Sequence, residues 1–169
     1  MVITVHCYLL SFPPSRYLHL TSDELLPREH PDYDPHFKAR PVAKHLLLKF
    51  QHYYYPRREI SIDESMIGFQ GRTSSKQFMP LKKYSKWGVK MWCLSEAKTG
   101  YLYRFLILGG RLAKSKEENK PSYAVLQLLR MEPSIIKNGH SLATDNFFTS
   151  PALAAEVRKF FQYVTCNFA

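Results

Sequence analysis

Three strand-like runs between residues 59 and 108 constrain the fold of this chain more than any other feature. They cover 59–69, 87–94 and 101–108, and each is rich in β-branched, aromatic or alternating apolar residues. Gly100 can adopt the left-handed conformation that a turn between the second and third runs often needs. We therefore expect these two strands to be antiparallel neighbours, with the first strand joining them in a meander.

Helical and strand patterns alternate after this β region. The expected elements are a helix over 121–131, a short buried strand over 141–148, a helix over 150–161 and a further strand over 161–168. Ser150 suits the N-cap of the second helix, and Pro151 suits its first position. Three strands followed by helix, strand and helix indicate a mixed α/β fold.

The N-terminal part reads differently. Residues 1–41 are rich in proline, which fixes φ and removes a backbone donor, so we expect an extended N-terminal arm there. Its first apolar residues are too few to span a membrane. Residues 42–169 form the expected core, which begins with a helix over 42–54. The predicted buried face of that helix carries Val42, Leu46, Phe50 and Tyr53.

The composition favours a folded, basic protein. A chain of 169 residues that is 45% hydrophobic and 14% aromatic can bury one core. Its net charge of +10 favours a polyanionic partner, most simply nucleic acid, and the alternative is a basic surface that only maintains solubility. Cys7, Cys93 and Cys166 have no zinc-ligand spacing and no disulfide pattern, so a reducing compartment is expected.

Much of the positive charge lies between Met66 and Arg104, where Glu96 is the only acidic residue. The basic residues of this stretch are Arg72, Lys76, Lys82, Lys83, Lys86, Lys90, Lys98 and Arg104. Phe78 and Trp87 are among the aromatic residues between them. Basic side chains track phosphates and aromatic rings stack on exposed bases, so the stretch predicts a nucleic-acid surface. The alternative is a solvated face whose aromatic residues turn into the core.

Asp63 is the first candidate for chemistry. It lies inside the first strand-like run, where a carboxylate is costly unless it is paired or bound to a cation. Period-two alternation places Asp63 and Glu64 on opposite faces, so we do not expect both to bind one ion. The alternative role for Asp63 is to cap a neighbouring loop.

Asp145 is the second candidate. It follows the apolar residues that lead the expected strand over 141–148. Ligands of α/β proteins tend to bind beyond the carboxyl ends of strands, and a carboxylate there suits magnesium. The alternative is a turn residue, because Asp-Asn is common in turns.

Two blocks, 62–66 (IDESM) and 144–150 (TDNFFTS), resemble those around the first and second catalytic aspartates of piggyBac-type transposases. The resemblance extends from about Ser15 to Lys159. It implies a ribonuclease-H-like fold in which three aspartates bind two divalent ions, Mg²⁺ or Mn²⁺, and cut and rejoin DNA at TTAA targets. Asp63 aligns with the first aspartate and Asp145 with the second, so the resemblance implies catalytic and metal-binding roles for both.

The same resemblance implies double-stranded DNA as the partner and the nucleus as the location. The residues that it places near the DNA backbone, by position and charge, are Arg72, Lys76, Lys82, Lys83 and Lys86. The family's third aspartate lies well beyond Asp145, whereas no acidic residue follows Glu156 here, and the cysteine-rich zinc module has no counterpart.

We therefore expect a partial catalytic core that retains two of the three aspartates and is inactive alone. Four alternatives stay open: a DNA-binding module without chemistry, a regulator that associates with a full-length transposase, a fragment of an active transposase, and a chain without function whose exposed sheet edges favour aggregation. Whether the chain forms a dimer is also left open.

Overall fold

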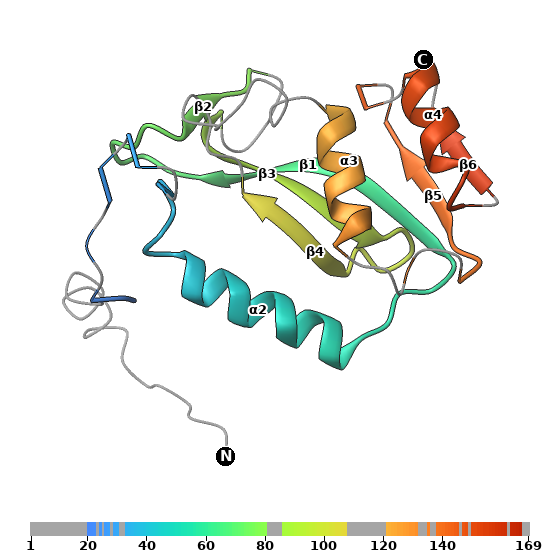
Figure 1. Ribbon diagram of the computed structural model, residues 1–169, viewed down its shortest axis with the longest axis horizontal. Helices are drawn as coiled ribbons and strands as arrows, with labels where there is room; N and C mark the ends of the chain where they lie inside the picture. Colours follow the sequence, from blue (N-terminus) through green and yellow to red (C-terminus); the bar gives the residue numbers. More distant parts are fainter. Residues whose placement is uncertain are drawn as a thin grey trace.

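The computed structural model describes the chain over residues 20–22, 24, 26–27, 29–30, 33–80, 86–107, 121–131, 135, 138–145, 147–148, 150–161 and 163–166. Six strands of this part form one sheet, in the order β2-β3-β1-β5-β6 with β4 also paired to β3 (Figure 1). Both antiparallel and parallel pairs occur in it, which makes the sheet mixed.

The antiparallel half is built around β3 (Trp87–Glu96). β1 (Glu59–Gly68) pairs along one edge of β3, and β2 (Lys76–Phe78) and β4 (Leu102–Ile107) share its other edge. The turn from β3 to β4 contains Gly100 at a φ of 71°, which is the left-handed conformation expected for it. The predicted meander of the first three strands is therefore confirmed.

The parallel half extends the sheet from the other edge of β1. β5 (Ser141–Thr144) pairs parallel to β1, and β6 (Tyr163–Cys166) pairs parallel to β5. Parallel neighbours need a crossover connection, usually a helix. α3 (Pro121–Arg130) precedes β5 and α4 (Pro151–Val157) precedes β6, so the mixed α/β fold is confirmed. The finer ribonuclease-H-like assignment stays a prediction.

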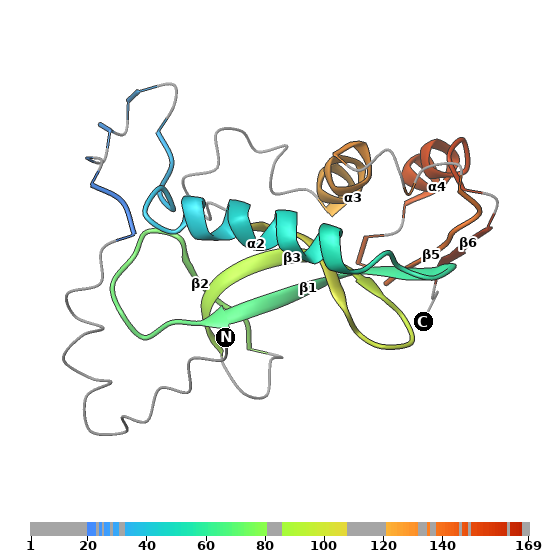
Figure 2. The same ribbon diagram turned by 90° about the horizontal axis from the view of Figure 1, so that it is seen from below.

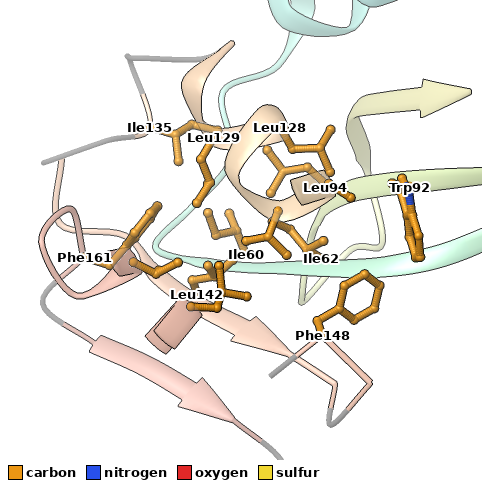
Figure 3. Packing of buried hydrophobic residues seen from close by; sticks show 14 of the residues in the cluster. Ile60, Ile62, Trp92, Leu94, Leu128, Leu129, Ile135, Leu142, Phe148 and Phe161 are labelled. Carbon is orange, nitrogen blue, oxygen red and sulfur yellow. The ribbon is translucent and has the colours of Figure 1, made fainter. Parts of the chain in front are cut away.

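The main core lies between the sheet and the two C-terminal helices. Ile60 and Ile62 of β1 are each 1% exposed, and they meet Leu128 of α3 and Leu142 of β5 (Figure 3). α3 and α4 lie next to each other toward the end of the sheet that holds β5 and β6, whereas α2 runs along β3 (Figure 2). Burial of this apolar cluster holds β1 and β5 side by side.

α2 (Arg40–Tyr53) packs on the opposite face of β3 and β4. Its Ala43 meets Cys93 and Phe105, whose strand neighbours point into the main core instead. Pro41 stands in the first turn of α2, where its missing N–H costs nothing. This helix therefore covers the face of β3 and β4 that points away from the main core.

The predicted buried face of α2 is only partly confirmed, because Phe50 packs against the cluster of Ala43, Cys93 and Phe105 whereas the other three predicted residues are exposed. Val42 and Leu46 are each 40% exposed and Tyr53 is 73% exposed. Ala43 is buried instead, and the partly buried residues packed with it include Leu47. Both stripes have helical spacing, so periodicity alone could not choose between them, and the contact with β3 and β4 decides.

The predicted C-terminal ends of β5 and α4 are also wrong. The strand over 141–148 ends at Thr144, because a turn begins at Asp145, whose carbonyl accepts a hydrogen bond from the Phe148 N–H (3.0 Å). The helix over 150–161 ends at Val157. Its predicted N-cap is confirmed, since the Ser150 hydroxyl accepts from a backbone N–H of the first turn.

Other expectations fall partly outside the described residues. Most of the proline-rich arm over 1–41 lies there, and the expected division at residue 42 stays a prediction. β2 was not predicted, because three residues in a basic stretch give no periodic signal. Within the part of the chain that the structure describes, no helix is both long and apolar enough to cross a membrane.

Candidate functional site

Asp63 lies in the middle of β1, with its side chain exposed. Its neighbour Ile62 is buried in the main core, so alternation turns Asp63 to the other face of the sheet. Asp63 is directly opposite Cys93 of β3, which packs against α2. One carboxylate oxygen accepts a hydrogen bond from the backbone N–H of Glu64 (2.6 Å). The sheet thus presents this carboxylate to solvent on the α2 face.

Asp145 is the first residue after β5, and it is also exposed. The parallel register of β1 and β5 ends with Ile62 opposite Thr144. Asp63 and Asp145 are the next residue in each chain segment. The structure therefore brings together two aspartates that are 82 residues apart in sequence (positions 63 and 145).

The donor set fits a hard divalent cation. A cation shared by two carboxylates from neighbouring strand positions offsets the repulsion between their charges. Magnesium binds through one or two carboxylates while it keeps several waters or takes substrate phosphates as further ligands. Among the described residues, no group of three or more His, Cys, Asp or Glu side chains could hold a metal. A cation held at Asp63 and Asp145 would therefore have two protein carboxylates as ligands within the described residues.

Comparison with known proteins identifies the family. A family model described as Transposase IS4 matches residues 15–167. The chain belongs to this transposase family. Its fold resembles that of piggyBac transposase in a cryo-electron microscopy structure of a synaptic complex with hairpin DNA, with a TM-score of 0.66 and 24% identity. The resemblance to piggyBac-type transposases is therefore confirmed for the fold, and the family model confirms that the chain is of a transposase family.

The match covers 79% of this chain and 27% of the piggyBac transposase chain, so this transposase-family chain spans about a quarter of that protein. Mos1 transposase, in a paired-end complex with the left transposon end, aligns over 89% of this chain and 47% of its own at 10% identity. Its TM-score of 0.36 is too low to indicate a shared arrangement of elements.

The candidate DNA-contact residues that the structure describes lie near the C-terminal end of β1, in β2 and just before β3. Arg72 and Lys86 are exposed, and Lys76 lies in β2. The Lys76 ammonium donates to the carbonyl of Gly71 (3.0 Å) and lies 5.3 Å from the centroid of the Trp87 ring. Lys82 and Lys83 lie outside the described residues.

Aromatic side chains are exposed among these charges. Phe78 and Trp87 are opposite each other in β2 and β3, with ring centroids 4.8 Å apart, and they are 50% and 52% exposed. Gly68, at this end of β1, is five residues beyond Asp63, or roughly 16 Å along a strand. The basic and exposed aromatic groups thus lie on β2, at the start of β3 and in the adjoining loops, beside the end of β1 that is remote from Asp63.

An ion pair beside the site was not predicted from the sequence. The Lys90 ammonium lies 2.7 Å from a carboxylate oxygen of Glu64, on the face opposite Asp63. The prediction that Asp63 and Glu64 lie on opposite faces of the sheet is confirmed. The alternation in both strands could have predicted this ion pair. It places Glu64 and Lys90 on the core face of the sheet, where a carboxylate is costly unless it is paired with a cation.

One further acid, Glu96, has a different environment. It is fully buried at the end of β3, and the Thr99 hydroxyl donates a hydrogen bond to its carboxylate. The Arg57 guanidinium lies 3.7 Å from its other oxygen. The Thr99 hydrogen bond, helped by Arg57 and opposed by burial, holds the pKa of Glu96 below its ordinary value. Glu96 therefore connects the β3–β4 turn to the segment after α2.

Proposed function

We propose that this chain is a DNA-binding and divalent-metal-binding part of a piggyBac-type transposase or of a protein derived from one. The observation that carries the proposal is the register of β1 and β5, which ends one residue before Asp63 and Asp145. Membership of a transposase family supports the same reading.

In this proposal, Asp63 and Asp145 hold Mg²⁺ or Mn²⁺ through their exposed carboxylates. When bound there, the ion would supply activation of a water or a 3′-hydroxyl and stabilisation of a leaving oxygen in DNA strand cleavage and transfer. The chain's own contribution is rigid placement of both carboxylates, which the buried residues beneath β1 and β5 provide. Their negative charge, rather than any zinc-type ligand, sets the preference for a hard cation.

Double-stranded DNA is the proposed polyanionic partner, with TTAA as the target and the nucleus as the location by the piggyBac resemblance. The proposed backbone contacts are Arg72, Lys76, Lys82, Lys83 and Lys86. Basic groups in this region attract phosphates, while exposed rings such as Trp87 can stack on bases. The piggyBac transposase with the same fold was itself determined with hairpin DNA.

We further propose that these 169 residues alone do not cleave DNA. The described residues offer two acidic ligands at the site, while the resemblance implies three for the complete enzyme. Catalytic groups that act as a unit lose most of their rate when one is missing. Incubation with Mn²⁺ and a TTAA-containing duplex is expected to give no specific product. Nicking that disappears in Asp63→Ala would contradict this part of the proposal.

The metal site is tested by titration with Mn²⁺, followed by electron paramagnetic resonance of the unbound ion. Wild-type protein is expected to bind, and Asp63→Asn and Asp145→Asn are each expected to abolish most of the binding. Glu59→Gln is the matched control, because Glu59 is an exposed acid on the same face of β1, at its beginning. Equal binding by all four proteins would rule out the proposed site.

The DNA surface is tested by the salt dependence of duplex affinity. Each lost phosphate contact lowers the slope of log affinity against log salt by about one. Lys86→Gln is expected to do so. Lys98→Gln is the control, because Lys98 is an exposed lysine of the turn at the opposite end of β3. A salt-independent affinity in the wild type would exclude a DNA-binding role.

A second candidate function is association with a full-length transposase, including a dimer. The observation that favours it is the exposed apolar stripe of α2, formed by Val42, Leu46 and Tyr53. Co-purification with an intact relative, reduced by Leu46→Ser, tests this function. DNA affinity that survives the same substitution would separate the two roles.

A further inference from the structure

Lys90 lies on the opposite face of the sheet from Asp63 and contacts residues that are close in sequence to both aspartates. Its ammonium is 2.7 Å from the carboxylate of Glu64, the residue directly after Asp63. It also lies 5.1 Å from the centroid of the Phe147 ring, two residues after Asp145. A single side chain on β3 therefore contacts both segments that carry a carboxylate.

Aromatic residues hold the Lys90 ammonium in place. It lies 4.1 Å from the centroid of Trp92, and the rings of Trp92 and Phe147 stack with 28° between their planes. The Lys90 side chain is only 12% exposed. Cation–π attraction strengthens when the cation loses water, so this position favours an ordered ammonium.

The turn after β5 depends on the same cluster. Phe148 is buried against Trp92, with ring centroids 4.9 Å apart, and its N–H donates to the Asp145 carbonyl. Phe147 is 59% exposed, so its packing on Lys90 and Trp92 is what orders it. Both aromatic residues of the turn that begins at Asp145 therefore pack against Trp92.

We propose that Lys90 is a positioning residue, which keeps Asp63 and Asp145 at the spacing that a divalent cation requires. The proposal rests on the proposed metal site and adds a residue on the far face of the sheet. Lys90 acts through Glu64 on β1 and through Phe147 on the turn, and it does not touch the cation. Outer partners of metal ligands commonly change metal affinity by about ten- to a hundredfold.

The test compares Lys90→Met with Lys90→Arg. Methionine keeps the length and apolar stem of lysine but loses the charge, while arginine keeps the charge and can still lie over an aromatic ring. Lys98→Met is the matched control on an exposed turn of the same β3–β4 hairpin. Mn²⁺ affinity is expected to fall roughly tenfold in Lys90→Met, to recover in Lys90→Arg and to stay unchanged in Lys98→Met.

Phe147→Leu is a second test, because it removes the aromatic ring but leaves the ion pair between Lys90 and Glu64 in place. It is expected to weaken Mn²⁺ binding as Lys90→Met does, and the double variant is expected to be no weaker than the stronger single variant. Thermal unfolding of each variant is measured alongside. A loss of affinity that follows the loss of stability, and that arginine does not restore, would overturn the positioning role.

Amide exchange at Phe148 gives a readout that needs no metal. Its protection reports the hydrogen bond to the Asp145 carbonyl, and it is expected to fall in Lys90→Met and in Phe147→Leu but not in Lys98→Met. If wild-type protein binds no Mn²⁺, the proposed function fails, and unchanged protection would then reject the role of Lys90 as well. If the wild type binds Mn²⁺ and Lys90→Met binds equally well, only the role of Lys90 is rejected.

Discussion

Two acidic regions of this molecule, Glu96 on one side and Asp63 with Asp145 on the other, belong to the same sheet but have opposite surroundings. Glu96 is fully buried, and the Thr99 hydroxyl and Arg57 guanidinium both act on its carboxylate. Asp63 and Asp145 are both exposed, and the register of β1 and β5 places them next to each other. The first region encloses its carboxylate together with a cation and a hydrogen-bond donor, and the second has two exposed aspartates just beyond the last paired residues of β1 and β5.

This difference separates a carboxylate that the protein encloses from two that it exposes. A buried carboxylate must be satisfied by the protein itself, because leaving it unpaired is strongly destabilising. Exposed carboxylates that are held close together gain from an external cation and contribute little to folding without one. We therefore expect substitutions at Glu96 to change stability and substitutions at the aspartates to change metal binding.

The largest expected effect is on metal affinity. The double variant Asp63→Asn/Asp145→Asn removes both ligands but keeps their size, so Mn²⁺ affinity is expected to fall by more than roughly a hundredfold. Glu96→Gln is expected to retain wild-type affinity. Isothermal titration calorimetry with Mn²⁺ measures both. A similar loss in both variants would show that metal binding follows folding rather than the aspartate pair.

The next effect is on stability. Glu96→Ala leaves Arg57 without this carboxylate and the Thr99 hydroxyl without its acceptor, so a marked fall in Tm is expected. Differential scanning calorimetry measures it. Thr99→Val, which removes one donor only, is expected to lower Tm by less. An unchanged Tm in Glu96→Ala would show that this carboxylate does not support the β3–β4 turn.

The acid dependence of stability is expected to be smaller. The pKa of Glu96 is lowered in the folded chain from its ordinary value of 4.5, chiefly by the Thr99 hydrogen bond. Its stabilisation is therefore complete above that ordinary value and is lost as the pH falls through the lower pKa of the folded state. Urea unfolding at a series of pH values is expected to show this loss in the wild type. In Glu96→Gln, the same part of the pH dependence should disappear.

The smallest expected effect is on the stability of the single aspartate variants. Asp63→Asn removes one charge at an exposed position and keeps the size of the side chain, so the free energy of unfolding is expected to change by less than about 0.5 kcal/mol. Chemical denaturation in the absence of metal measures this. A large loss of stability would mean that Asp63 supports the fold, as Glu96 does.

Patterns of a few residues were enough to predict most of the elements. The alternation around Ile60 and Ile62 predicted a strand with one buried face, and both residues are 1% exposed. Ser150 before Pro151 predicted a helix start, and the Ser150 hydroxyl caps α4. These signals succeed because they depend on local backbone geometry. The strand over 141–148 failed at Thr144 because the apolar Phe147 and Phe148 lie in a turn and pack against Trp92 rather than extending β5.

The candidate site was predictable only in part. Asp63 and Asp145 could be named from their positions in strand-like segments and from the piggyBac resemblance. The contribution of Lys90 could not, because it depends on a partner from β1 and another from the turn after β5. The buried face of α2 could not be chosen either, since two stripes of this helix have the same period.

The sequence by itself therefore determined which segments are strands or helices and which acidic residues were candidates, because these depend on neighbours a few positions apart. Only the tertiary structure decided that β5 pairs parallel to β1, which places residues 63 and 145 side by side. It also assigned Glu96 to the interior and Lys90 to the back of the site. Such contacts join segments far apart in the chain, and they are selected by burial of a common core rather than by local pattern.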